Sequence, residues 1–201
     1  PKWTAITGID AFSHSLESYF NKSNRTPFSD MICLEGMKWI IQYLPKAYKD
    51  GTSLEARTGV AYGATLGGIA ISLAGTTVGH ALVHPTDVRI GTPHGISVSI
   101  YLLSVLKHTL PVDIERFGNI VRIFDPFIEQ VEKKVMEKGL HIIESFISQF
   151  SFPRKLSDYG VDKEMVDVIV EDTLNYMFRP LNQHAKIFNK DQLRQIVIDS
   201  F

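Results

Sequence analysis

Residues 60–84 read VAYGATLGGIAISLAGTTVGHALVH and contain no Asp, Glu, Lys or Arg. A charge-free run of this length could span a lipid bilayer. It is, however, rich in glycine, alanine and threonine, and it includes His80, whose imidazole is costly to place in lipid. Small side chains allow neighbouring helices to pack closely. The run therefore predicts a buried central helix of a helical bundle and no membrane span.

Helical periodicity also dominates the sequence on either side of this run. Apolar residues at helical spacing, separated by proline and glycine, predict helices over 7–20, 28–43, 53–84, 95–107, 113–123, 126–150, 162–178 and 190–200. The first helix is expected to begin at Thr7, and the helix over 53–84 is expected to break near its glycine pairs. Strand patterns are almost absent, although ISVSIYLL at 96–103 is compatible with a buried strand. We predict an all-α, multi-helix bundle that forms a single domain over residues 1–201.

Composition limits the classes of protein that this chain can represent. Of its 201 residues, 44% are hydrophobic and 21% are charged, as in a globular protein with an apolar core. A net charge of −1 gives no basic surface for nucleic acid. The single cysteine, Cys33, excludes an internal disulfide and fits a reducing compartment, so we expect a cytoplasmic protein. The sequence contains no GxxxxGK[ST], no GxGxxG after a strand and no GxSxG, which argues against a phosphate loop, a dinucleotide turn and a serine hydrolase.

Three of the seven histidines lie close together in GHALVHPTDVRIGTPHG, residues 79–95. His80 and His84 are four residues apart, so on a helix their side chains share one face, with Cβ atoms about 5–6 Å apart. Metal–nitrogen bonds are about 2.0–2.1 Å long, so two such imidazoles could bind one ion. Pro85 disfavours helical geometry at the preceding residue, and we expect His84 to end its helix. His94 is expected at the beginning of the next helix.

Asp10 and His14 show the same spacing near the N-terminus. A carboxylate combined with imidazoles forms a mixed oxygen and nitrogen site that suits Zn²⁺ or Fe²⁺. The spacing alone leaves His84 as eligible for ligation as His80. It also leaves open that Asp10 is a capping-box acid paired with Thr7, and that His14 is a buried core histidine. The other histidines are expected to be structural or at the surface: His108, His141 and His184.

Several segments in combination resemble the iron-containing (group III) alcohol dehydrogenases over essentially the whole chain. The resemblance rests first on TGIDAFSHSLESYF at 7–20, GHALVH at 79–84 and PHG at 93–95. NRTPFSDMICLEGMKWI at 24–40, SFPRKLSDYGV at 151–161 and FRPLNQHAKIFNKDQLRQIV at 178–197 extend it. It implies the dehydroquinate synthase-like, helical C-terminal domain of that family. The family's N-terminal α/β dinucleotide-binding domain has no counterpart in these residues, so we expect the chain to be a fragment of a longer two-domain protein.

The resemblance also implies a reaction and roles for individual residues. The implied metal ligands are Asp10, His14, His80 and His94. By the same resemblance the catalytic residue His84 would not bind the ion but would face the nicotinamide cofactor and the substrate, as a proton relay or an orienting group. The bound Fe²⁺ or Zn²⁺ would polarise the oxygen of a small alcohol or aldehyde for hydride transfer involving NAD(H) or NADP(H), which the N-terminal domain would bind. The family resemblance further implies a homodimer.

One segment departs from the family pattern. After Pro85, residues 86–92 read TDVRIGT, unlike the commoner family loop, so the identity of the alcohol stays unassigned and no substrate-binding residue is predicted. The same ligand set would also serve a metal-assisted hydrolase or lyase in which the ion activates water. A third interpretation is a non-catalytic, metal-binding helical module when the domain is isolated.

Overall fold

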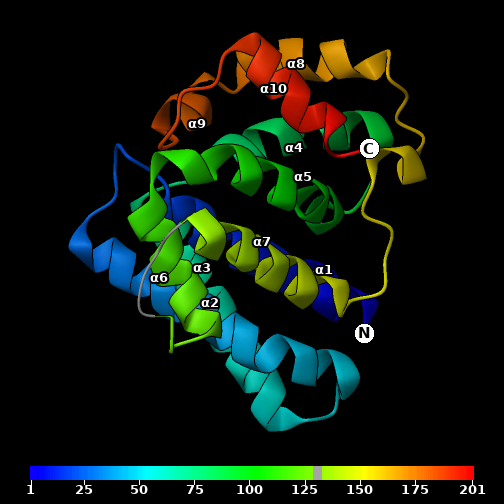
Figure 1. Cartoon of the computed structure of the whole chain (residues 1–201). Coiled ribbons are helices and arrows are strands. Elements are labelled where there is room, and N and C mark those ends of the chain that lie inside the picture. The colour runs from blue at the N-terminus through cyan, green and yellow to red at the C-terminus, as the bar shows by residue number, and fades with distance from the viewer. Residues whose placement is uncertain (129–132) are drawn as a thin grey trace.

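The computed structural model describes residues 1–128 and 133–201, and in these residues it contains α-helices and short 3₁₀-helices but no β-strand (Figure 1). The all-α prediction is therefore confirmed. The elements are α1 (Lys2–Tyr19), α2 (Pro27–Lys49), α3 (Leu54–Leu73), α4 (Val78–Ile90), α5 (His94–Thr109), η1 (Leu110–Val112), α6 (Ile114–Phe124), α7 (Lys133–Ser148), η2 (Leu156–Tyr159), α8 (Met165–Tyr176), α9 (Phe178–Gln183) and α10 (Lys190–Ile198).

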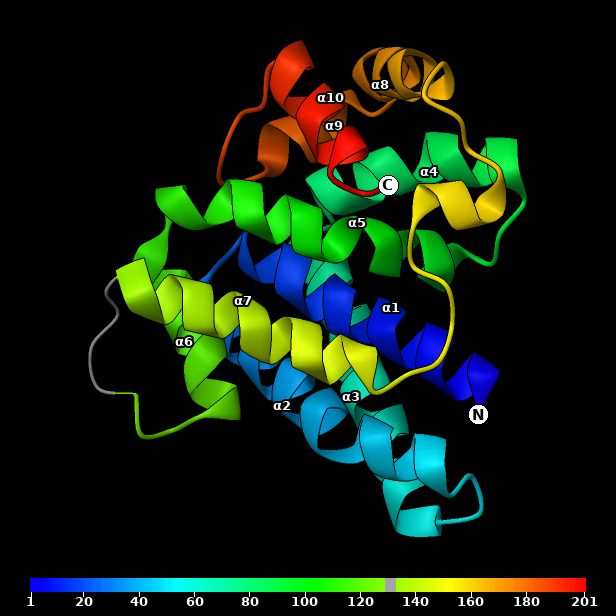
Figure 2. The same ribbon diagram turned by 45° about the vertical axis from the view of Figure 1, so that its right-hand side comes forward.

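The helices form two groups that meet along α1 and α5 (Figures 1 and 2). α1 packs against α2 and α3 on one side and against α5 on the other, while α4, α5, α8 and α10 pack together beyond it. Each group has its own apolar core, and α5 contributes side chains to both. The first core includes Phe12, Met37, Ile40, Phe117, Phe146 and Phe150, and the second includes Leu82, Tyr101, Ile169, Leu193 and Ile196. The junction of α1, α4 and α5 thus lies between the two cores.

Helix α1 begins five residues earlier than the sequence pattern predicts. It starts at Lys2 rather than at Thr7, because the buried face of the helix extends towards the N-terminus through Ala5 and Ile6. Thr7 lies inside the helix, where its hydroxyl donates a 2.9 Å hydrogen bond to the Trp3 carbonyl. The open alternative that Asp10 is a capping-box acid is therefore excluded. The Asp10 carboxylate projects from the middle of the helix towards α4 and α5.

A sharp bend separates α3 from α4. The break falls at residues 74–77, after the glycine pair at 67–68, and Gly75 adopts φ +87°, a left-handed conformation that favours glycine. The two helices are bent by 101° relative to each other. Among the described residues no single helix has the length and apolar composition to cross a membrane, and α3 and α4 meet that criterion only as a bent pair.

Helix α4 continues through its proline, so the prediction that His84 ends the helix is wrong. The helix runs on past Pro85 to Ile90. Pro85 and Thr86 are buried, and the Thr86 hydroxyl donates a 2.8 Å hydrogen bond to the Leu82 carbonyl. Burial of this turn outweighs the local preference of the residue before a proline. His84 therefore stands in the middle of a helix instead of at an open end.

The other predicted helices are present with shifted ends. α2 continues through Pro45, six residues past its predicted end at 43, and α5, α6, α8 and α10 match their predicted ranges closely. The predicted helix over 126–150 corresponds to α7 from Lys133, while its residues 129–132 lie outside the described chain. The sequence pattern does not predict the short helix α9, because a proline, Pro180, lies within its six residues.

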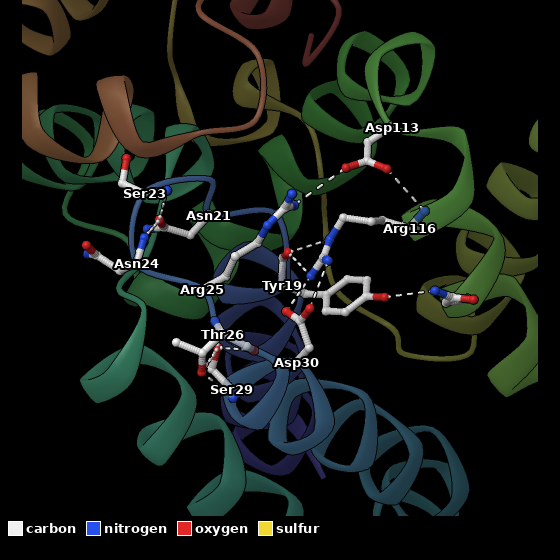
Figure 3. A network of polar contacts seen from close by, with 11 residues as sticks. Tyr19, Asn21, Ser23, Asn24, Arg25, Thr26, Ser29, Asp30, Asp113 and Arg116 are labelled. Carbon is white, nitrogen blue, oxygen red and sulfur yellow. Dashed lines mark hydrogen bonds and ion pairs between the residues drawn. The ribbon is translucent and has the colours of Figure 1, made fainter.

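Arg116 ties the end of α1 to α2 and α6 (Figure 3). Its Nε and Nη2 donate to the Tyr19 carbonyl at 2.9 and 2.6 Å, and its Nη1 donates to Asp30 Oδ2 at 2.9 Å. The guanidinium carbon also lies 3.6 Å from the centroid of the Tyr19 ring. The last carbonyls of a helix have no partner within it, and a planar guanidinium suits both them and a carboxylate. One side chain thus satisfies the end of α1 and the beginning of α2.

We expect Arg116→Met to lower the free energy of unfolding by roughly 2–4 kcal/mol, because the Asp30 carboxylate and the Tyr19 carbonyl lose their shared donor. The Arg116 side chain is only 13% exposed. Arg194 is the matched control: it donates to Asp167 at 2.8 Å, but its side chain is 44% exposed. Arg194→Met should cost less than about 0.5 kcal/mol in the same urea titration. Equal losses in the two variants would contradict this assignment.

Candidate metal centre

The candidate site lies at the junction of α1, α4 and α5. α1 places its site residues at positions 10, 14 and 17, on successive turns of one face, and α4 places two more at 80 and 84. α5 contributes its first residue, as predicted. The side chains brought together are Asp10, His14, Glu17, His80, His84 and His94.

Three of the predicted ligands converge on one oxygen atom of the fourth, Asp10. Asp10 Oδ1 lies 3.5 Å from His80 Nε2, 3.5 Å from His14 Nε2 and 3.8 Å from His94 Nε2. Asp10, His80 and His94 each offer one ligand atom, and these atoms lie within 4.8 Å of one another. Tetrahedral ligand atoms bound at about 2.1 Å are roughly 3.4 Å apart. The spacing of Asp10, His80 and His94 is therefore that of atoms sharing one small ion, whereas His14 contacts Asp10 but lies outside this group of three.

His84 lies beside this set but outside it. Its ring centroid is 6.3 Å from that of His80 and 5.5 Å from that of His94, and no close contact joins it to Asp10 among the described residues. The side chain is exposed, at the edge of the site. The structure thus distinguishes His80, which faces Asp10, from His84, which does not. The sequence spacing alone leaves the two residues equivalent.

Two buried atoms at the centre of the site have no hydrogen-bond partner. They are Asp10 Oδ1 and His80 Nε2. Buried polar atoms are nearly always paired, so such atoms need an explanation. Their separation of 3.5 Å exceeds that of an ordinary N–H···O hydrogen bond. Both atoms carry a lone pair when His80 is protonated on Nδ1, and a cation between them satisfies both.

Two carboxylates that the sequence reasoning missed orient the ligand imidazoles. Glu17 Oε1 accepts from His80 Nδ1 at 2.7 Å, and Asp87 Oδ2 accepts from His94 Nδ1 at 2.7 Å. Each carboxylate holds a proton on Nδ1 of its imidazole and so turns Nε2 towards Asp10, where its lone pair is available whenever the ring is neutral. Carboxylate–histidine pairs of this kind support the ligands of metal sites. The spacing of Glu17 from Asp10, two helical turns, was the signal that could have found it.

The carboxylates control the charge of the site. Burial opposes ionisation of Glu17, but the His80 charge and hydrogen bonds from Thr77 and His80 lower its pKa to about 2. Burial also opposes the charged form of His80, but Glu17 and Asp10 raise its pKa to about 10. For Asp10, the neighbouring imidazoles outweigh burial and lower the pKa. Burial lowers the pKa of His14. Anionic groups on both sides of His80 therefore favour a bound positive charge.

Burial and the neighbouring His94 and His80 lower the pKa of the fourth histidine of the site, His84. A pocket of about 280 Å³ opens beside it. The pocket lies between α4 and the end of α8, and its lining is mostly apolar: His84, Pro85, Val88, Arg89, Asp172, Tyr176 and Met177.

A chain of hydrogen bonds leads from the site into the protein. The Thr77 backbone N–H and hydroxyl donate to Glu17 Oε2 at 2.7 and 3.1 Å. The Thr77 hydroxyl lies 3.0 Å from His184 Nδ1, and His184 Nε2 lies 2.9 Å from the Thr109 hydroxyl. His184 is 1% exposed, so of the two expected places, core or surface, it lies in the core. Among the other histidines, His108 pairs with Asp199 and His141 is exposed at the surface.

The comparison with protein families identifies the family of the chain. The model described as "Fe-containing alcohol dehydrogenase family, C-terminal" matches residues 4–201. The chain belongs to the Fe-containing alcohol dehydrogenase family. This confirms the resemblance and the helical C-terminal fold that it implied.

Individual members of the Fe-containing alcohol dehydrogenase family match at moderate identity. The NAD-dependent methanol dehydrogenase of Bacillus methanolicus is 29% identical over 84% of this chain and 44% of its own length. The NADPH-dependent butanol dehydrogenase of Clostridium saccharobutylicum is 28% identical over 98% of this chain and 50% of its own length. The solved structure of an alcohol dehydrogenase from Oenococcus oeni superposes with a TM-score of 0.93 at 25% identity, over all of this chain and 52% of that one. The chain thus spans about half the length of the relatives that it matches.

The buried His184 predicts a pH dependence of stability in the metal-free protein. Burial lowers its pKa from 6.5 to about 4, so between these values the unfolded chain binds a proton that the folded protein does not. Stability therefore falls as the pH drops through this window, by an amount on the order of 3 kcal/mol at its lower end.

Urea unfolding of wild type and His184→Asn at about pH 7 and about pH 4.5, with chelator present, measures this contribution. The wild type should be the more stable protein at the higher pH, and its advantage should shrink at the lower pH because only the wild type carries this titrating group. An advantage that stays constant with pH would refute the assignment.

Proposed function

We propose that this chain is the metal-binding, catalytic part of an NAD(P)-linked alcohol dehydrogenase. In this proposal residues 1–201 form one domain in which Asp10, His14, His80 and His94 hold Fe²⁺ or Zn²⁺. A dinucleotide-binding domain, outside the half of the relatives that the chain matches, supplies NAD(H) or NADP(H). The observation that carries the proposal is the pair of buried, unpartnered ligand atoms, Asp10 Oδ1 and His80 Nε2, at 3.5 Å.

The residues around the centre determine its charge and geometry. When held there, Fe²⁺ or Zn²⁺ supplies a Lewis acid that polarises the oxygen of an alcohol or aldehyde. Asp10 reduces the net charge of the centre by one, because it is the only carboxylate in the proposed ligand set. Glu17 and Asp87 hold the imidazoles of His80 and His94 so that neither ring can rotate away from Asp10.

His84 has the position of a proton relay. Its exposed ring lies at the edge of the ligand set, 5.5 Å from the His94 ring, and next to the pocket of about 280 Å³. We assign to His84 the transfer of the alcohol proton towards solvent and contact with the nicotinamide. The apolar side chains of Val88 and Met177 would then contact the alkyl group of the substrate. The small pocket and the methanol and butanol named in the relatives favour a small alcohol.

The same ligands would also support a metal-assisted hydrolase or lyase. The relatives are named as dehydrogenases, so we favour hydride transfer. A cytoplasmic location, expected from the single cysteine, and a homodimer, implied by the family resemblance, stay predictions.

The metal content of single variants distinguishes the proposed metal ligands from the proposed proton relay. In the intact protein, His80→Ala and His94→Ala should lose nearly all iron or zinc, because each removes a nitrogen facing Asp10. His84→Ala should retain the metal and lose roughly 100-fold or more of the NAD(P)-linked alcohol oxidation. His141→Ala is the control, since its side chain is 80% exposed and remote from the site.

Elemental analysis and NAD(P)H absorbance give the two readouts. Loss of metal in His84→Ala would contradict the assignment of His84. Full metal content in His80→Ala would contradict the proposed centre itself.

A further inference from the structure

We infer that His184 is a positioning residue for the metal centre, acting through Thr77 and Glu17 on the ligand His80. The inference rests on the proposed function, since it concerns the same centre. It assigns a role to a residue more than one hundred positions from His80 in the sequence and distant from the ligand set in the fold.

The contacts form one unbroken chain. His80 Nδ1 lies 2.7 Å from Glu17 Oε1, and the other oxygen of Glu17 is 3.1 Å from the Thr77 hydroxyl. The Thr77 hydroxyl is 3.0 Å from His184 Nδ1, and His184 Nε2 is 2.9 Å from the Thr109 hydroxyl. All five residues are buried. Water therefore cannot replace any link without opening the core.

The proton of each link has one consistent direction. The Glu17 carboxylate can only accept, so the Thr77 hydroxyl donates to it and His80 donates from Nδ1. Thr77 has then used its proton and must accept from His184 Nδ1–H. His184 Nε2 is left as an acceptor for the Thr109 hydroxyl. The reversed tautomer of His184 would take the Thr77 proton and leave Glu17 without this donor.

The surroundings hold the His184 ring in place. Its centroid lies 6.4 Å from that of Phe20 and 5.4 Å from that of Phe188, and the neighbouring Gln183 carbonyl accepts from the Lys22 N–H at 2.8 Å. The single proton of the Thr109 hydroxyl is shared between His184 Nε2 and the Val105 carbonyl, which lies at 2.7 Å. The ring is thus fixed by aromatic packing and by the backbone. Its hydrogen bond to the Thr77 hydroxyl holds that hydroxyl in one orientation.

Two pairs of variants test the chain while controlling for stability. Asn at position 184 places an amide near Nδ1 and retains the link to Thr77, whereas Gln places its amide near Nε2 and retains only the link to Thr109. Thr77→Ser retains the hydroxyl, and Thr77→Val removes it at nearly the same shape. The readouts are the dissociation constant of Fe²⁺, measured anaerobically in the intact protein by competition with a chromophoric chelator, and the unfolding free energy of the metal-free protein.

We expect His184→Gln and Thr77→Val to weaken Fe²⁺ binding by roughly 10-fold or more, and His184→Asn and Thr77→Ser to stay within about 3-fold of wild type. Equal affinities within each pair, or affinities that only follow the metal-free stability, would overturn the inference while leaving the proposed centre intact. A wild type that binds no Fe²⁺ would instead refute the proposed centre and this inference together.

Discussion

The buried carboxylate of Glu17 is the group on which the arrangement of this molecule depends. It projects from α1 to the first turn of α4, where it accepts from the N–H groups of Thr77 and His80, the Thr77 hydroxyl and His80 Nδ1. The N-terminus of a helix carries unpaired N–H groups and a partial positive charge, which stabilise an anion there. A single charge therefore joins the two groups of helices and orients a ligand of the candidate centre.

Close helix packing makes this contact possible. A Cβ atom on Gly79 would lie 2.3 Å from Glu17 Oε1, so any side chain at that position would displace the carboxylate. At the beginning of α5, a Cβ atom on Gly95 would lie 2.3 Å from the Ile6 carbonyl of α1. Small residues thus bring α4 and α5 onto α1, and the bend at Gly75 directs the start of α4 towards it. The glycine-rich composition that argues against a membrane span has its physical role here.

Sequence reasoning was most successful where the pattern is local. Helical spacing identified the faces that carry Asp10 and His80, and the structure brings these residues together. The errors at Thr7 and His84 have a common cause. A cap is worth about 0.5–2 kcal/mol and a proline inside a helix costs about 3 kcal/mol, whereas each buried apolar side chain contributes about 1.5–3 kcal/mol, so burial of several residues outweighs either local preference. Burial of the turns before Thr7 and after His84 decided the helix ends.

Two of the supporting residues, Asp87 and His184, could not be found in this way, because each makes its contact with a residue of another element. Asp87 reaches His94 across the turn between α4 and α5, and His184 reaches Thr77 from the far end of the sequence. The ligand pairs, in contrast, repeat the same spacing on one helix face. A ligand set can thus be read from spacing, while its second layer requires the fold.

The balance of charge at the centre links metal binding to folding. Three carboxylates lie at or beside the candidate centre: Asp10 itself, Glu17 on His80 and Asp87 on His94. Of their negative charges, only that of Glu17 is stabilised directly by the N-terminus of α4. Asp10 Oδ1 is a buried acceptor whose nearest nitrogen atoms, Nε2 of His80 and of His14, both lie 3.5 Å away, beyond ordinary hydrogen-bond distance. Charged groups in such surroundings are costly unless they are paired. A divalent ion would compensate the carboxylates and satisfy the open lone pairs in one step. Its binding would stabilise the folded state, since the unfolded chain lacks this arrangement of donors.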